Sequence, residues 1–275
     1  MTNEHKQHPT FDYQRTLDEI VTWAAQESNV RAVVLTGSAA AQSQHPLSDR
    51  DIELHVQDTS PLEESDDWWS HLGDVLAVER LENGDDQPTR LIYYVGGKLD
   101  FTLVNVDEDG GEYDRPFSVL LDKDGAAERF QLVERTLELP DQELFDECTN
   151  WAAAAALMTA KAIVRDEPWS VATRDADFQA ELLRMIEWDH NLRYGPDRDV
   201  RYLGTRMRQW MDADIQGRLS RCWTTFGGDN RAALRSSLNL FEELAGRVAS
   251  HAALSDFHHR AVRSEVERIL QVPST

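Results

Sequence analysis

The chain has 275 residues, of which 41% are hydrophobic and 28% charged, the balance of a globular protein with a sizeable core. Its 50 acidic residues outnumber 28 basic ones and give a formal net charge of -22, a field that repels nucleic acid and attracts Mg²⁺ and polyamine-like cations. No apolar run could cross a membrane, and residues 1–9 lack the apolar core of a signal peptide. We therefore expect a cytoplasmic protein without nucleic-acid or membrane partners. A charge that serves only solubility or salt tolerance is the alternative.

The first 140 residues alternate short apolar runs with turns. Residues 11–28 predict a helix, and a second, short helix is expected to begin at Ser38. β-Branched or alternating runs predict five strands, over 31–36, 51–56, 75–81, 90–95 and 98–106. Gly96-Gly97 predicts a hairpin turn between the last two.

From residue 141 the apolar residues recur with helical period. Helices are predicted over 141–166, 175–194, 203–223, 229–250 and 255–270, and Pro168 is expected to stop the first of them. The predicted fold class is α+β, with a mixed five-stranded sheet in a catalytic domain of residues 1–140. An all-α helical bundle of residues 141–275 would bind substrate or nucleotide. The sequence does not determine the oligomeric state, with a monomer favoured.

The chemistry is concentrated in residues 35–56 (LTGSAAAQSQHPLSDRDIELHV). Gly37-Ser38 ends a strand, where glycine permits close approach and the serine hydroxyl with exposed N–H groups can cradle phosphate oxygens. Asp49 and Asp51 stand two apart at a strand start, so both carboxylates project from one face. Hard oxygen ligands on one rigid edge suit Mg²⁺. An Asp-x-Asp pair also arises by chance in so acidic a chain, as solvated carboxylates at a turn.

A third carboxylate favours the metal site over the turn. Asp100 lies in the otherwise apolar strand KLDFTLVNV (98–106), where a lone carboxylate is costly unless it is paired or bound to metal. Beside Asp49 and Asp51 it would complete a catalytic three-carboxylate site able to hold two Mg²⁺ ions.

This order of Gly-Ser, Asp-x-Asp and a separate strand carboxylate resembles the polymerase-β-like nucleotidyltransferase superfamily. More narrowly, the chain resembles the aminoglycoside 6-adenylyltransferase (streptomycin adenylyltransferase) family. The blocks that carry this resemblance are KLDFTLV (98–104), LLDKDG (120–125), FDECTNW (145–151), KAIVRDE (161–167) and ELLRMIEWDH (181–190). The resemblance implies ATP and Mg²⁺ dependence, and transfer of AMP to a hydroxyl of an aminoglycoside such as streptomycin (6-position). Pyrophosphate would be released and the antibiotic inactivated, which confers resistance.

The resemblance also implies roles for the residues. Asp49 and Asp51 would hold the metals that bridge the triphosphate, and Ser38 with the Gly37 backbone would contact the β and γ phosphates. Asp100 would lie nearest the attacking hydroxyl as metal ligand, general base or both. Family members usually have arginine directly after Gly-Ser, whereas this chain has Ala39, which leaves the nucleotide preference open.

The helical half offers further candidates. Lys161, which matches a lysine of the family, and Arg165 are spaced i, i+4 on one side of a helix and are predicted to bind the nucleotide; a surface ion pair is the alternative for Lys161. Asp189 falls on the inward stripe of its helix beside Trp188, so both are predicted to bind the cationic substrate. A buried salt bridge between Asp189 and an arginine is the alternative.

Three functions follow in order of preference. The first is an aminoglycoside O-adenylyltransferase. The second is nucleotidyl transfer to another cationic hydroxylated ligand, or from another nucleotide. The third is a non-catalytic relative that only binds its ligand, against which the complete set of three carboxylates argues, because a pure binder needs no pair of metals.

Overall fold

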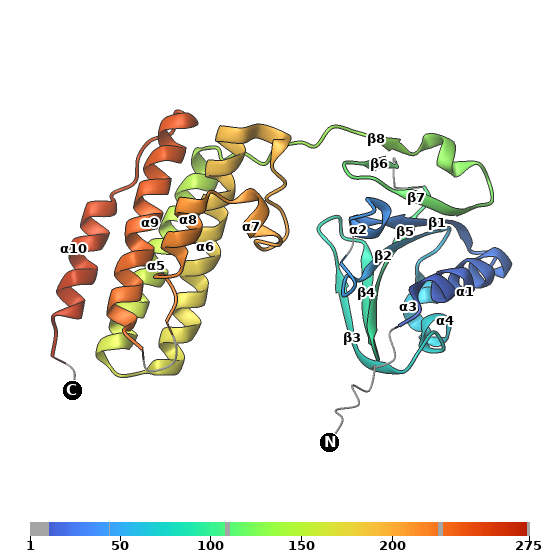
Figure 1. Cartoon of the computed structure of the whole chain (residues 1–275), viewed down its shortest axis with the longest axis horizontal. Helices are drawn as coiled ribbons and strands as arrows, with labels where there is room; N and C mark the ends of the chain where they lie inside the picture. Colours follow the sequence, from blue (N-terminus) through green and yellow to red (C-terminus); the bar gives the residue numbers. More distant parts are fainter. Residues whose placement is uncertain (1–10, 44, 108–110, 225–227, 274–275) are drawn as a thin grey trace, which may run out of the picture. The chain divides into compact units, whose positions relative to one another are not determined.

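The computed structural model describes residues 11–43, 45–107, 111–224 and 228–273; residues 1–9, considered above for a signal peptide, lie outside this range. The chain divides into two compact units, Met1–Arg135 and Thr136–Thr275. The first contains the sheet, and the described part of the second contains only helices (Figure 1). The α+β class is therefore confirmed. None of the described helices combines the length and apolar character needed to cross a membrane.

A six-stranded sheet forms the centre of the first unit, with the spatial order β3-β4-β5-β2-β1-β7. Its strands are β1 (Val30–Thr36), β2 (Arg50–Val56), β3 (Val75–Glu82), β4 (Pro88–Tyr94), β5 (Gly97–Asn105) and β7 (Ser118–Asp122). β2 and β5 are parallel and all other neighbours are antiparallel, so the sheet is mixed as predicted. The predicted count of five strands is wrong, because β7 adds a sixth on the edge beside β1. A half-exposed edge strand of five residues lacks the alternation by which the others were recognised.

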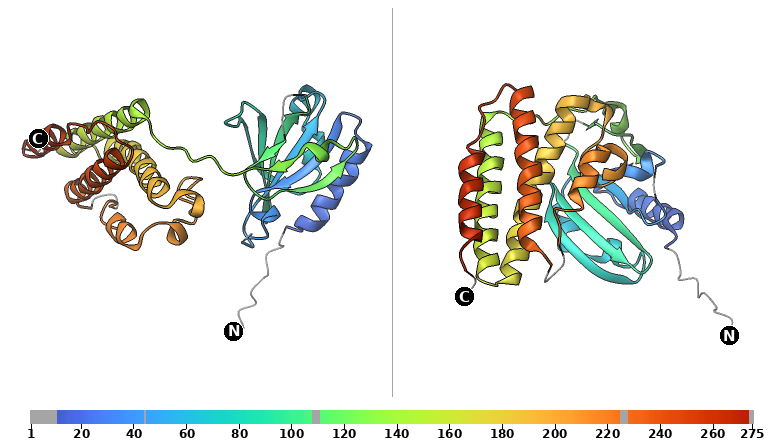
Figure 2. Two further views of the ribbon diagram at one scale, coloured as in Figure 1. Left: turned by 90° about the horizontal axis from the view of Figure 1, so that it is seen from above. Right: turned by 60° about the vertical axis from the view of Figure 1, so that its left-hand side comes forward.

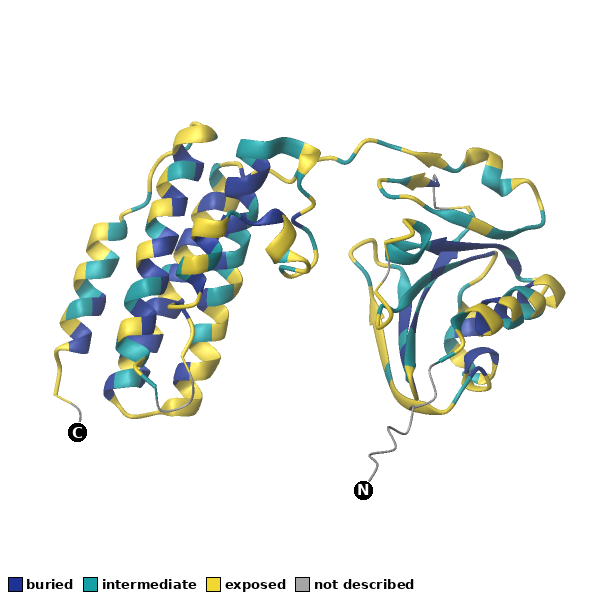
Figure 3. Ribbon diagram, viewed as in Figure 1, coloured by how far each residue is buried: buried dark blue, intermediate teal, exposed yellow. Residues whose placement is uncertain are grey.

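One face of this sheet is apolar and covered. Helices α1 (Tyr13–Gln26), α3 (Ser60–Glu64) and α4 (Asp67–Ser70) supply side chains that pack in one core with β1, β2, β4 and β5. In β2 and β5, Ile52, Leu54 and Phe101 are fully buried there, as the dark colour of these strands in Figure 3 indicates. Because strand side chains alternate, Asp51 and Asp100, which directly precede Ile52 and Phe101, project from the opposite face.

Short elements lie between the main strands and after them. α2 (Gly37–Ala40) directly follows β1, and the 3-10 helix η1 (Ala126–Arg129) follows β7. β6 (Glu112–Tyr113) and β8 (Gln131–Leu132) form a separate two-stranded parallel sheet.

The second unit is built from four longer helices that pack side by side (Figure 2). They are α5 (Gln142–Val164), α6 (Pro168–Tyr194), α9 (Asn230–His251) and α10 (His259–Leu270). α7 (Met207–Trp210), α8 (Ala213–Leu219) and the 3-10 helix η2 (Gly195–Asp197) connect α6 with α9. Asp141 and Asp229 cap α5 and α9 by accepting a hydrogen bond from a first-turn N–H group. The helices enclose a core of aliphatic and aromatic side chains.

Two helix predictions need correction. α5 ends at Val164, and Pro168 begins α6 instead of stopping the preceding helix, because the first helical turn has no use for the N–H group that proline lacks. The helix expected over 203–223 is two short helices, α7 and α8. Met211 is extended between them, and the backbone N–H of Asp212 donates to the ring of His190 at 3.1 Å, which holds the chain away from a continuous helix.

Candidate metal and nucleotide site

Three carboxylates meet on the face of the sheet opposite the apolar core. Asp49, Asp51 and Asp100 are all half-buried, and each offers a ligand oxygen within 4.8 Å of the other two. The parallel pairing of β2 with β5 places Asp51 directly beside Asp100. Asp49 immediately precedes β2, two residues from Asp51 on the same side. The structure thus brings together the three acidic residues that the sequence suggested as metal ligands.

Lys98 neutralises part of this cluster. Its Nζ donates to Oδ2 of Asp100 at 2.7 Å and to Oδ2 of Asp49 at 3.1 Å. No motif in the sequence marks Lys98 as a site residue. Its position on β5, two residues before Asp100, puts both side chains on one face, so the strand period could have revealed it.

Burial and mutual repulsion govern the protonation of the cluster. Burial raises the pKa of Asp100 from 3.8 to about 6, although the ion pair with Lys98 opposes this rise. Burial, with the charge of Asp49, also raises the pKa of Asp51, and Arg115 lowers it in part. For Lys98, burial favours the neutral amine, but Asp100 and Asp49 together raise its pKa. The carboxylates therefore hold more negative charge than their surroundings stabilise, and a cation at this point would relieve it.

Gly37 makes room for Asp51. Its φ of +64° lies in the left-handed region, and a Cβ atom at this position would lie 1.9 Å from Oδ2 of Asp51. A side chain here would therefore displace the carboxylate. Ser38, the next residue, is half-buried in α2, so the predicted phosphate cradle stands directly beside the acidic cluster.

The residues present fit a hard divalent cation. Each of the three acids provides oxygen, the donor that Mg²⁺ prefers. Oδ1 of Asp100 is buried and has no hydrogen-bond partner among the described residues, and a bound cation would satisfy it. Arg50 fixes the backbone that carries Asp49, since its guanidinium donates to the carbonyl oxygens of Ser48 and Asp49, both at 2.9 Å.

Lys161 and Arg165 lie together in the helical unit. Both are exposed near the end of α5, where they line a hollow of about 300 Å³ with Val164. The other lining residues are Ile269, Val272 and Pro273. Lys161 also lies near Glu265, whose pKa its charge helps to lower. Nucleotide binding by these two residues stays a prediction.

Asp189 is buried in an ion-pair cluster. Only 1% of it is exposed, and its Oδ2 accepts hydrogen bonds from Arg193 Nε at 3.0 Å and Arg247 Nη2 at 3.2 Å. This arrangement is the buried salt bridge that the sequence left open as the alternative, with Arg247 Nε 3.1 Å from Oδ1 as well. Trp188 is 5% exposed, with the Arg184 guanidinium 4.8 Å from its ring centre. Substrate contacts of Asp189 and Trp188 stay predictions.

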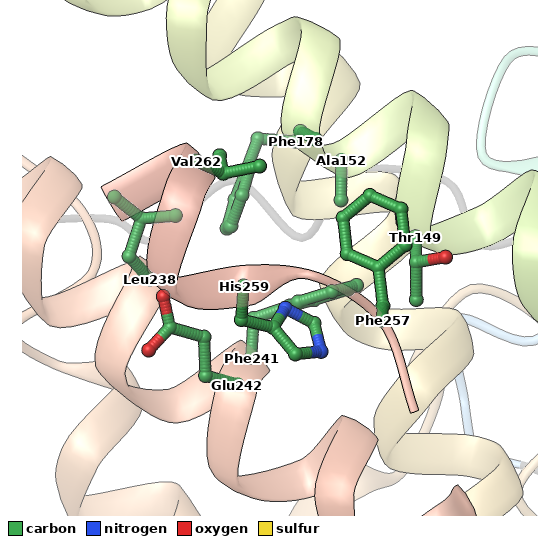
Figure 4. A pocket seen from close by; sticks show the side chains of 10 residues that line it. Thr149, Ala152, Phe178, Leu238, Phe241, Glu242, Phe257, His259 and Val262 are labelled. Carbon is green, nitrogen blue, oxygen red and sulfur yellow. The ribbon is translucent and has the colours of Figure 1, made fainter. Parts of the chain in front are cut away.

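A small cavity inside the helical unit has no room for either proposed substrate. Figure 4 shows it among Phe178, Phe241, Phe257 and His259. Its volume of about 10 Å³ is space for roughly one water molecule. Neither a nucleotide nor an aminoglycoside could occupy it.

Comparison with known proteins assigns the family. The sequence model of the family described as streptomycin adenylyltransferase matches residues 12–266, nearly the whole chain. Among curated proteins, none matches. Similar solved structures include an aminoglycoside 6-adenyltransferase from Bacillus subtilis (19% identity, TM-score 0.46, covering 94% of this chain and 98% of that chain). Another is a nucleotidyltransferase-like protein from Exiguobacterium sibiricum (10% identity, TM-score 0.31, covering 87% and 77%). From the family match, the chain belongs to the streptomycin adenylyltransferase family and is a nucleotidyltransferase of the aminoglycoside adenylyltransferase type.

Proposed function

We propose that this enzyme transfers AMP from ATP to a hydroxyl group of streptomycin, at its 6-position, and releases pyrophosphate. Two Mg²⁺ ions would act as cofactors, and the cytoplasm, which supplies ATP and Mg²⁺, would be the compartment. The resulting nucleotide ester would inactivate the drug and confer resistance. The substrate carries several positive charges, in keeping with a protein whose formal net charge is -22.

The convergence of Asp49, Asp51 and Asp100 carries this proposal. Acidic side chains that are only solvated at the surface need not converge on one point. Nucleotidyl transfer, by contrast, needs carboxylates that converge beside a phosphate-binding turn. Bound metal ions would neutralise the triphosphate and stabilise the leaving pyrophosphate. Asp49 and Asp51 would hold them, with Asp100 as the third ligand.

The chain's own groups would align the reaction. The substrate hydroxyl oxygen attacks the α-phosphorus, a new P–O bond forms, and the bond from that phosphorus to the β-phosphate oxygen breaks. The carboxylate of Asp100, which lies beside the other two acids, would accept the hydroxyl proton. Without metal, burial raises the pKa of Asp100 to about 6, so its carboxylate is more basic than that of an exposed aspartate. Gly37 and Ser38 would receive the β and γ phosphates on their backbone N–H groups and the serine hydroxyl.

The helical unit would contribute to nucleotide binding. Lys161 and Arg165, whose side chains share one hollow, would provide positive charge for the nucleotide phosphates, in a chain whose 50 acidic residues outnumber 28 basic ones. This contribution is relevant because Ala39 stands where the family usually has arginine.

A pyrophosphate-release assay tests the proposed function. Purified full-length protein is supplied with ATP, Mg²⁺ and, one at a time, streptomycin and aminoglycosides that lack its guanidinium groups. We expect release only with streptomycin, loss of release with EDTA, and a product whose mass has increased by one AMP. NMR of the product identifies the modified hydroxyl.

Each other outcome selects an alternative. Release with a different cationic acceptor, or with another nucleotide triphosphate, would replace streptomycin or ATP and keep the reaction class. Calorimetric binding of streptomycin without any release, under conditions where Mg²⁺ also binds, would favour the non-catalytic relative.

A further inference from the structure

Lys98 occupies one oxygen of each of two carboxylates in the acidic cluster. Its ammonium lies between Oδ2 of Asp49, just before β2, and Oδ2 of Asp100 on β5, at 3.1 and 2.7 Å. It therefore links the segment before β2 to β5 across the acidic cluster. A divalent ion bound to the same oxygens would bring a second cation within a few ångströms of the ammonium, where like charges repel strongly.

The ammonium can move although its backbone is fixed. The backbone N–H of Lys98 donates to the Tyr13 hydroxyl at 3.1 Å, and Lys98 pairs with Tyr93 across β4 and β5. The Tyr93 ring centre lies 5.2 Å from Nζ, within range of a cation–π interaction. The flexible four-carbon stem thus has a second favourable position close to the first.

We propose that Lys98 is a positioning residue that serves as the site's own counter-cation. Without metal, it holds Asp49 and Asp100 together against their mutual repulsion. When metal binds, the ammonium leaves these oxygens for the Tyr93 side of the site. Metal binding therefore includes the cost of breaking two ion pairs, and the free enzyme binds divalent ions more weakly than its carboxylates alone would allow.

This inference rests on the proposed metal site and extends it. It gives an unusual expectation, because removal of a side chain from the centre of the site should strengthen metal binding. A merely structural lysine would have the opposite effect, since its loss would let the carboxylates separate and weaken their grip on the ion.

The test measures binding of Mn²⁺ alone to the full chain, by the EPR signal of the free ion, without nucleotide or aminoglycoside. Lys98→Met should lower the Mn²⁺ Kd about tenfold, equivalent to about 1.4 kcal/mol. Lys98→Arg, which keeps the charge, should stay within about threefold of the wild-type Kd, equivalent to about 0.7 kcal/mol. Lys123→Met is the matched control, because it removes the same charge from the same unit, where Lys123 Nζ donates to the Glu27 carbonyl.

An unchanged or raised Kd in Lys98→Met would overturn the inference. If that variant does not fold, Lys98→Gln replaces it and the same comparison applies. An equal fall in Kd for Lys123→Met would assign the effect to net charge and overturn the inference too. If the wild type binds no Mn²⁺, or if Asp100→Asn leaves its Mn²⁺ binding unchanged, the proposed metal site is wrong and Lys98 has no such role. If the wild type binds Mn²⁺ through Asp100 but Lys98→Met leaves the Kd unchanged, only the role of the lysine is refuted and the metal site stands.

Discussion

Replacement of Asp100 by asparagine should abolish turnover and yet stabilise the metal-free protein. Asparagine keeps the shape of the side chain and removes the charge whose burial raises the pKa from 3.8 to about 6. A shift of this size corresponds to at most about 3 kcal/mol at neutral pH. Partial exposure and adjustment of Lys98 reduce it, so we expect a gain of about 1 to 2 kcal/mol. For a unit of this size, the melting temperature should rise by roughly 4 to 8 °C.

The gain should depend on pH in a defined direction. Because the folded-state pKa of Asp100 is raised, its neutral form contributes stability below about pH 4, and this contribution is lost as pH rises through about 6. The two proteins should therefore differ most above pH 7 and little near pH 4. Thermal unfolding of both, with EDTA between pH 4 and 8, measures the difference. Addition of Mg²⁺ should stabilise the wild type and leave the variant almost unchanged.

Asp85→Asn supplies the control. Asp85 is an exposed residue of the same unit, and its replacement makes the same change in net charge away from the site. A rise in melting temperature equal to that of Asp100→Asn would mean that general repulsion in an acidic protein explains the effect. A fall in melting temperature for Asp100→Asn that is the same at pH 5 and pH 7.5 would show that the ion pair with Lys98 outweighs the cost of burial, and the predicted stabilisation would be refuted.

Three further substitutions test the remaining residues. Gly37→Ala should lower kcat at least a hundredfold, since its Cβ would lie 1.9 Å from Oδ2 of Asp51. Gly84→Ala is the control, because open space surrounds its Cβ and kcat should not change. Equal rates in both variants would contradict the proposed phosphate-binding role of Gly37 and Ser38. Lys161→Ala should raise the KM for ATP several-fold without changing that for the aminoglycoside, and an unchanged KM for ATP would leave it a surface cation. Asp189→Asn should destabilise the protein by about 3 to 5 kcal/mol by denaturant unfolding, because it breaks a buried ion pair; a rise in the aminoglycoside KM with unchanged stability would instead support substrate binding.

Local sequence signals were sufficient for the strands and for the acidic residues. The predicted strands agree with β1, β2, β3, β4 and β5 to within two residues at each end, because alternating and β-branched runs are typical of strands. Asp100 was recognisable for a related reason. A single carboxylate in an apolar strand is energetically unfavourable there, and local rules are commonly broken in this way at functional positions.

The spatial neighbours of these residues had no local signal. β2 and β5 are parallel although β3 and β4 lie between them in the chain, and only this pairing brings Asp51 beside Asp100. Arg247, which binds Asp189, is 58 residues away in sequence, so the helical wheel could show that a partner was needed but not which one. The edge strand β7 escaped notice because its five residues, SVLLD, neither alternate nor form a β-branched run.

The position of Asp100 also separates two explanations of the acidic composition. Acids that serve solubility gain from exposure to water, and their carboxylates have no reason to meet. Asp100 is half-buried in a strand whose neighbours Leu99 and Phe101 are fully buried, and its own burial works against its charge. Solubility therefore cannot account for it, whatever it explains of the net charge of -22. We propose that this carboxylate, which is costly where it stands and meets two others at one point, serves a cation that would add to the partial neutralisation by Lys98.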